Sequence, residues 1–210
     1  MRLIKYTHAC VRIEHDGQVL VIDPGTWSED EALAGANAVL VTHEHADHID
    51  VDRIAAAAAA DADLRVYAPD PIAAQLTERG ATVVTVAVGD TVTAAGLPVE
   101  VVGGLHAEIY EGLPGCANVG FVVAGDVYHP GDSFFVPSQQ VRTLLVPTSG
   151  PWFTMAGMLD FVRAVKPQRA HSIHDAMLSE RGLNGVDRWI DWKGNTEYSR
   201  IDLGESVTLS

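Results

Sequence analysis

The sequence predicts an α/β protein in which two β-sheets are covered by helices, within one domain that spans residues 1–210. Short β-branched segments alternate with helix-forming segments along the chain. This alternation occurs in two similar halves, and no Ser-, Gly- or Pro-rich linker separates them. Hydrophobic residues make up 47% of the 210 residues, enough to bury a substantial core.

The first half begins with a predicted hairpin over residues 10–23. Apolar and polar residues alternate there, and Asp16-Gly17 is a turn pair typical of two-residue hairpins. Residues 37–42 are apolar on both faces, which predicts a buried strand that ends at a cluster of histidines. The remaining elements expected in this half are helices at 49–60 and 71–79, and strands at 64–68, 82–88, 91–94 and 97–102.

The helix expected at 71–79 has recognisable ends. We predict Asp70 as its N-cap, Pro71 as its first residue and Gly80 as the position after its C-cap. In the second half we expect a helix at 154–165, ended by Pro167, and strands at 119–123, 126–129, 143–147 and 169–173.

Charge and composition exclude several classes of protein. The formal net charge of −14 disfavours nucleic acid and anionic lipid surfaces as partners. We also expect no signal peptide and no membrane span, because the longest Ala-rich run is far too short to cross a bilayer. Cys10 and Cys116 form no C-x-x-C pair, so we expect a reducing cytoplasm and two buried thiols without catalytic roles.

The segment "HEHADH", residues 43–48, contains three histidines and an aspartate. His43 and His45 are two positions apart on a loop, so their rings can converge on one point. Asp47 and His48 are adjacent and can face a second point nearby. Imidazole suits zinc, iron or copper, and the carboxylate allows a second ion close by. The spacing H-x-H-x-D-H therefore predicts a site for two metal ions.

This motif after a buried strand resembles the signature of the metallo-β-lactamase superfamily, and the likeness covers nearly the whole chain. Further segments match in order: "VLVIDPG" (19–25), "GGLH" (103–106), "VYHPGDS" (127–133) and "RAHSIHDAM" (169–177). The chain resembles the small, single-domain metal-dependent hydrolases, which include ascorbate-6-phosphate lactonase-like proteins and phosphodiesterase-like enzymes. The resemblance implies a four-layer αββα sandwich of two mixed β-sheets flanked by helices.

The resemblance also implies the ligands of each metal ion. His43, His45 and His106 would bind one ion, and Asp132 would bridge it to the second. The second ion would be held by Asp47, His48 and His174. Zinc is the favoured metal, with manganese or iron as alternatives. Independently of the family, His106, Asp132 and His174 each follow an apolar segment that reads as a strand.

Several residues near these motifs have other expected roles. Asp23 should accept a hydrogen bond that supports the metal loop, and Glu44 should be a bystander. Between two nearby histidines, strand alternation places His171 on the core side and His174 at the strand end. The roles of His8, His129 and His171 stay open, as does the choice for Trp152 between a pocket wall and a packed loop.

The expected function is hydrolysis of a small ester, lactone or phosphodiester by a hydroxide that bridges two metals, with Asp47 orienting it. We expect a small substrate whose negative charge the metals neutralise. Whether the protein forms a homo-oligomer stays open. The alternatives are a non-catalytic metal-binding or scaffold protein with the same fold, and an iron oxidoreductase. Seven candidate ligands favour chemistry, because a structural zinc usually has four ligands and no open position.

Overall fold

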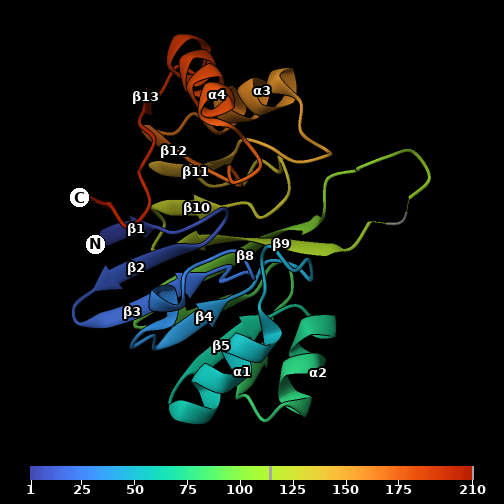
Figure 1. Cartoon of the computed structure of the whole chain (residues 1–210), viewed down its shortest axis with the longest axis vertical. Coiled ribbons are helices and arrows are strands. Elements are labelled where there is room, and N and C mark those ends of the chain that lie inside the picture. Colours follow the sequence, from blue (N-terminus) through green and yellow to red (C-terminus); the bar gives the residue numbers. More distant parts are fainter. Residues whose placement is uncertain (114, 210) are drawn as a thin grey trace.

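A computed structural model describes residues 1–113 and 115–209, and in these residues the chain forms two seven-stranded mixed sheets (Figure 1). In the first sheet the order is β14 (Ser206–Thr208), β1 (Arg2–Lys5), β2 (Val11–His15), β3 (Gln18–Ile22), β4 (Ala38–Leu40), β5 (Arg65–Ala68) and β6 (Val83–Thr85). In the second it is β13 (Glu197–Tyr198), β12 (Arg169–Ile173), β11 (Thr143–Pro147), β10 (Val127–His129), β9 (Ala117–Val123), β8 (Leu97–Leu105) and β7 (Thr91–Ala94).

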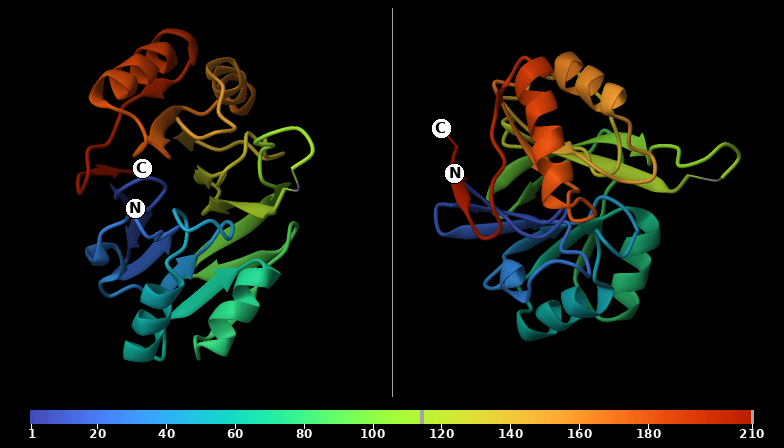
Figure 2. Two further views of the ribbon diagram at one scale, coloured as in Figure 1. Left: turned by 45° about the vertical axis from the view of Figure 1, so that its right-hand side comes forward. Right: turned by 45° about the horizontal axis from the view of Figure 1, so that its top comes forward.

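The two sheets pack face to face, and each carries a pair of helices on its outer face (Figures 1 and 2). A first apolar cluster, which includes Leu20 and Phe121, fills the space between the sheets. The first sheet is covered by α1 (Val51–Ala60) and α2 (Asp70–Glu78), and the second by α3 (Met155–Val165) and α4 (Glu180–Lys193). The predicted four-layer αββα sandwich is therefore confirmed.

The hairpin predicted over residues 10–23 is formed by β2 and β3, which pair antiparallel. Asp16 and Gly17 both have positive φ, 48° and 76°, as a two-residue turn that follows the twist of the strands requires. The sequence analysis did not predict β1, which pairs with β2 and with β14. This pairing brings the two ends of the described chain together in the first sheet.

The helices begin and end largely where their sequences indicate. Asp50 caps α1, since its side chain accepts a hydrogen bond from the Arg53 N–H at 3.0 Å. Thr154 caps α3 in the same way. The prediction for α2 was wrong at its start: Pro69 is the N-cap and Asp70 already lies in the first turn. Asp70 already has helical backbone angles, whereas Pro69 is extended and takes the N-cap position without a side-chain hydrogen bond.

The loops that carry the candidate ligands all leave the carboxyl ends of strands. β3 and β4 run parallel, as do β10, β11 and β12, so their carboxyl ends meet at common sheet edges. β8 is longer than predicted and runs through Leu105, directly before His106. Cys10 is fully buried in the apolar cluster under α1 and α2, as expected, whereas Cys116 is only half-buried. No helix within the described residues is long and apolar enough to cross a membrane.

Candidate metal centre

Asp23, which follows β3, holds the loop at 43–48 through hydrogen bonds to Thr42 and His48. One carboxylate oxygen of Asp23 accepts the Thr42 N–H at 2.8 Å, and the other accepts the Thr42 hydroxyl at 2.7 Å. The second oxygen also accepts Nδ1–H of His48 at 2.7 Å. The predicted role of Asp23 as a hydrogen-bond acceptor beneath the loop is confirmed by these contacts.

Asp132 lies at the middle of the candidate site. Its Oδ1 is 3.0 Å from Nε2 of His48, and its Oδ2 is 3.0 Å from Nε2 of His174 and 3.3 Å from Nε2 of His106. The same Oδ2 is 3.9 Å from Nε2 of His43. One carboxylate therefore faces rings from three segments that are far apart in the sequence.

The residues around Asp132 form two groups, in each of which the possible ligand atoms lie within 4.8 Å of one another. The first group consists of His43, His45, His106 and Asp132, and the second of His8, Asp47, His48 and His174. The structure thus brings together all seven residues that the sequence analysis selected. It adds His8, whose role the sequence left open.

The hydrogen bonds at Nδ1 of three rings direct their Nε2 atoms towards the centre, where Nε2 of His43 also lies 3.1 Å from Nδ1 of His45. Nδ1–H of His43 donates to the Thr42 hydroxyl oxygen at 3.0 Å, because that hydroxyl gives its own proton to Asp23. Nδ1–H of His48 donates to Asp23, and Nδ1–H of His106 donates to the Ala107 carbonyl at 2.6 Å. In the neutral form of each ring Nε2 is then the unprotonated nitrogen, and this is the form that binds a metal ion.

Among the described residues, the buried Nε2 atoms of His48, His106 and His174 face only carboxylate oxygens, chiefly those of Asp132, and none of these contacts is aligned as a hydrogen bond. Buried polar atoms are normally paired, because leaving one unpaired costs about 1–3 kcal/mol. Imidazole nitrogens and carboxylate oxygens together are suitable ligands for divalent zinc, iron or manganese. The donor set therefore fits the metal ions that the sequence predicts.

The electrostatics of the centre favour a cation. Burial opposes charge on Asp132, but His48 and the rings of His106 and His174 hold the pKa of its carboxyl well below the usual range. The pKa of Asp47 is likewise lowered, against the effect of burial, by His174 and His8. Burial and the neighbouring His48 lower the pKa of His43 well below its ordinary value, so that ring is neutral.

The structure gives roles to Trp152 and His171, which the sequence left open. Trp152 is buried and donates from Nε1 to Oδ2 of Asp132 at 3.0 Å, so it holds the carboxylate that faces both groups. His171 belongs to neither group: its Nδ1–H donates to the Ser199 carbonyl at 2.8 Å. Ile173 packs between the sheets and Ala170 under α3 and α4, which confirms the predicted alternation along β12.

A cavity of about 430 Å³ opens beside the first group of ligands. His45 and His106 line it, and Ile109 and Leu113 contribute apolar side chains. Cys116 contributes its thiol, with Sγ 4.0 Å from Nε2 of His45. The remaining lining residues are Glu44, Ala107, Glu108 and Gly115, so the described lining contains carboxylates and neither lysine nor arginine.

Comparison with known proteins gives the family. The family model of the Beta-lactamase superfamily domain matches residues 2–174. The chain is 38% identical over 185 residues to Protein Rv0786c of Mycobacterium tuberculosis, covering 85% of this chain and 86% of the relative. It is 31% identical over 155 residues to a UPF0173 metal-dependent hydrolase of Methanoculleus marisnigri, covering 70% and 65%.

Solved structures agree with this assignment at the level of the fold. Igni18, a metallo hydrolase from the archaeon Ignicoccus hospitalis, superposes with a TM-score of 0.78 at 20% identity, over 100% of this chain and 98% of that protein. The predicted superfamily is thus confirmed by a family model, by sequence relatives and by a shared fold. The chain belongs to the metallo-β-lactamase superfamily.

Proposed function

We propose that this protein is a metal-dependent hydrolase that uses two divalent ions, preferably zinc. The observation that supports this most directly is the position of Asp132, whose two carboxylate oxygens face His48 on one side and His106 and His174 on the other. A shared carboxylate between two groups of imidazoles is the arrangement that a pair of ions a few ångströms apart requires. The site residues proposed are His43, His45, Asp47, His48, His106, Asp132 and His174.

Bound divalent ions would supply Lewis acidity and lower the pKa of water towards neutrality. The protein's own residues then determine geometry. Trp152 holds Asp132 through a hydrogen bond of 3.0 Å, and Asp23 fixes the ring of His48. Asp47 is half-buried and ionised at neutral pH, so it can orient a nucleophile at the second ion. No serine or cysteine nucleophile is part of this scheme.

The cavity beside His45 supports a narrower proposal on the substrate. Its apolar side chains, Ile109 and Leu113, suit a hydrocarbon group, and its acidic residues, Glu44 and Glu108, disfavour an anion next to them. Among the expected substrates, the cavity therefore favours a neutral ester or lactone with an apolar substituent over an anionic compound. The free cysteines support a reducing cytoplasm as the location.

The test is a substrate screen with zinc-loaded protein, comparing neutral lactones and esters with phosphodiesters and thioesters. We expect turnover of the neutral apolar compounds, and loss of turnover in Asp47→Ala without loss of the folded state. Arg79→Ala, which removes an ion pair with Asp52 between two exposed side chains, serves as a surface control. Folded, zinc-replete protein that hydrolyses none of these compounds would favour a non-catalytic role instead.

A further inference from the structure

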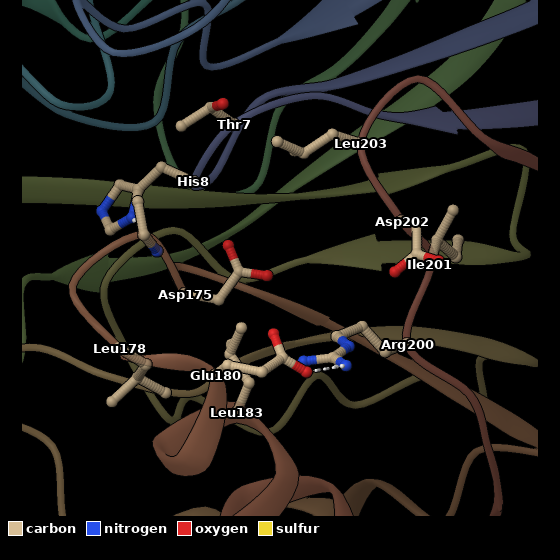
Figure 3. A pocket seen from close by; sticks show the side chains of 11 residues that line it. Thr7, His8, Asp175, Leu178, Glu180, Leu183, Arg200, Ile201, Asp202 and Leu203 are labelled. Carbon is tan, nitrogen blue, oxygen red and sulfur yellow. Dashed lines mark hydrogen bonds and ion pairs between the residues drawn. The ribbon is translucent and has the colours of Figure 1, made fainter.

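His8 is the histidine that the structure adds to the candidate centre, and its side chain is fully buried. Its ring packs between His174, with centroids 3.9 Å apart, and Trp27, at 4.7 Å. Figure 3 shows His8 beside Thr7 at the wall of a cavity of about 600 Å³, away from the ion pair of Arg200 and Glu180. The position allows two roles: a further metal ligand, or a support for another ligand.

The hydrogen bonds of the ring decide between these roles. The Ala176 N–H donates to Nδ1 of His8 at 3.3 Å. A backbone N–H can only donate, so Nδ1 carries no proton, and in the neutral ring the proton is on Nε2. Nε2 lies 3.1 Å from Oδ2 of Asp47 and therefore donates to it. A protonated Nε2 has no lone pair to offer a metal ion.

The main chain of His8 is also attached to the second group. Its carbonyl accepts the His174 N–H at 3.1 Å. Three residues earlier, the buried Lys5 contacts Oδ1 of Asp175 through Nζ at 3.2 Å. The segment from Lys5 to His8 thus holds the turn at 174–176, while the His8 ring holds Asp47. These two ligand segments are far apart in the sequence, and His8 contacts both.

The backbone at His8 has φ of 66°, in the left-handed region where few residues other than glycine occur. Such a conformation persists only when the surrounding contacts determine it. At His8 these contacts are the hydrogen bonds to Asp47, Ala176 and His174. The unusual backbone therefore places the ring between the two ligand segments.

We propose that His8 is a positioning residue for Asp47 and not a metal ligand: its Nε2–H fixes the carboxylate that faces the second ion. This inference rests on the proposed function only for its effect on turnover, since the protonated nitrogen can be observed in any folded sample. Removal of a residue that orients a ligand typically costs about 10- to 100-fold in metal affinity or activity.

Two variants separate positioning from ligation. His8→Gln retains an N–H donor near the place of Nε2, whereas His8→Ala removes it, and both keep a Cβ at the strained position. We expect His8→Ala to lower kcat by about 10- to 100-fold with little change in KM, and to bind two zinc ions at saturating zinc. His8→Gln should recover most of the lost kcat. His171→Ala, which removes a buried histidine outside both groups, is the matched control.

Nitrogen NMR of the histidine rings gives a readout independent of activity. We expect the proton of His8 on Nε2, both without metal and with zinc. A zinc-coordinated His8 ring, a proton on Nδ1, or loss of one zinc ion in His8→Gln would overturn the proposal, as would full activity of His8→Ala. If the zinc-loaded protein hydrolyses nothing, the proposed function fails, and the NMR spectra and zinc content still decide the role of His8.

Discussion

Asp132 reaches its central position through the residue before it. The Asp132 N–H donates to Oδ1 of Asn118 at 2.9 Å, and Gly131 has φ of 61°. A Cβ at Gly131 would lie 2.3 Å from that oxygen and 2.9 Å from the side chain of Thr42. Only glycine allows both this backbone angle and this close approach. The segment "PGD" therefore forms the turn and also directs the Asp132 carboxylate towards the candidate ligands.

At the same scale, His174 and not His171 should hold metal. Nε2 of His174 is 3.0 Å from Asp132, whereas Nδ1 of His171 is occupied by the Ser199 carbonyl. We expect His174→Ala to lose about one ion per chain, or at least about 10-fold in affinity, and His171→Ala to lose much less. Elemental analysis of the two purified variants measures this, and the reverse result would reject the proposed second site.

Metal binding should depend on pH through the second group. Burial lowers the pKa of His48, but Asp132 and Asp23 raise it well above its ordinary value. The pKa of His174 is also raised, by Asp132 and Asp47, against the effect of burial. Protons therefore compete with the ion held there, and affinity should fall as pH falls, by about 10-fold per pH unit for each proton displaced.

The first group should behave differently on acidification. Burial lowers the pKa of His43 and of His45, so those rings stay neutral to lower pH. We expect the ion at the second group to leave first when zinc-loaded protein is dialysed at decreasing pH. Measurements of zinc content and of released protons follow the loss of the ions. Simultaneous loss of both ions would contradict this order.

At the scale of elements, the loop at 43–48 rests directly on Gly25. A Cβ at Gly25 would lie 1.9 Å from the Asp47 carbonyl oxygen and 2.2 Å from its carbon. These are backbone atoms, so the loop as a whole would have to move. The strand-end aspartate and this glycine, in the segment "IDPG", together form the support of the loop.

Gly25→Ala should therefore damage both stability and metal binding. We expect a loss of about 1–3 kcal/mol in the free energy of unfolding, as for overpacked sites, with weaker zinc binding. Gly185→Ala is the control: it lies in α4, where an added Cβ meets nothing within 4 Å. That variant should gain about 0.5–1 kcal/mol, because alanine favours the helix. Denaturant unfolding of both variants decides the matter.

Elements that depend on distant partners have the weakest local signals in the sequence. β1 and β14 are short strands that pair with each other across almost the whole length of the chain. α4 has the sequence "ERGLNGVDRWIDWK", in which two glycines weaken the helical pattern. Its apolar face is stabilised against the second sheet through Val186 and Ile190. Tertiary packing, which outweighs local propensity, explains why these elements form.

At the scale of the whole molecule, we propose that residues 1–210 unfold as one domain. The apolar cluster between the sheets draws residues from both halves, and the candidate metal ligands also come from both. Calorimetry should show one transition with zinc and one, at lower temperature, after chelation. An ion present at about 100 times its Kd adds about 2.7 kcal/mol to the folded state. Two separate transitions would indicate two independent units.

The net charge of −14 leads to a second prediction at this scale. We expect no binding of duplex DNA or RNA at physiological salt, because repulsion of the phosphates opposes association. A fluorescence anisotropy titration with labelled oligonucleotides, with and without zinc, measures this. Salt-sensitive binding of the oligonucleotides that occurs only when zinc is present would show that the bound ions overcome the net charge.

The sequence by itself predicted the α/β class, the hairpin and most strands, which depend on local patterns of apolar periodicity and turn pairs. Its resemblance to the superfamily, together with polar residues directly after apolar strands, indicated seven of the residues in the candidate centre. The dense motif at 43–48 then indicated the chemistry, because few other purposes require three histidines and an aspartate within six positions. Strand alternation along 169–173, the position of His174 at the strand end and the family motif together favoured His174 over His171.

Only the tertiary structure decided which distant groups meet. His8 and Asp47 are 39 positions apart, and Trp152 reaches Asp132 from the next strand end. The sequence has no local signal for such pairs, because their contact depends on how the two sheets pack and on the direction of single side chains. The tautomer of His8 likewise follows from the Ala176 N–H, which the fold brings to it from 168 residues away.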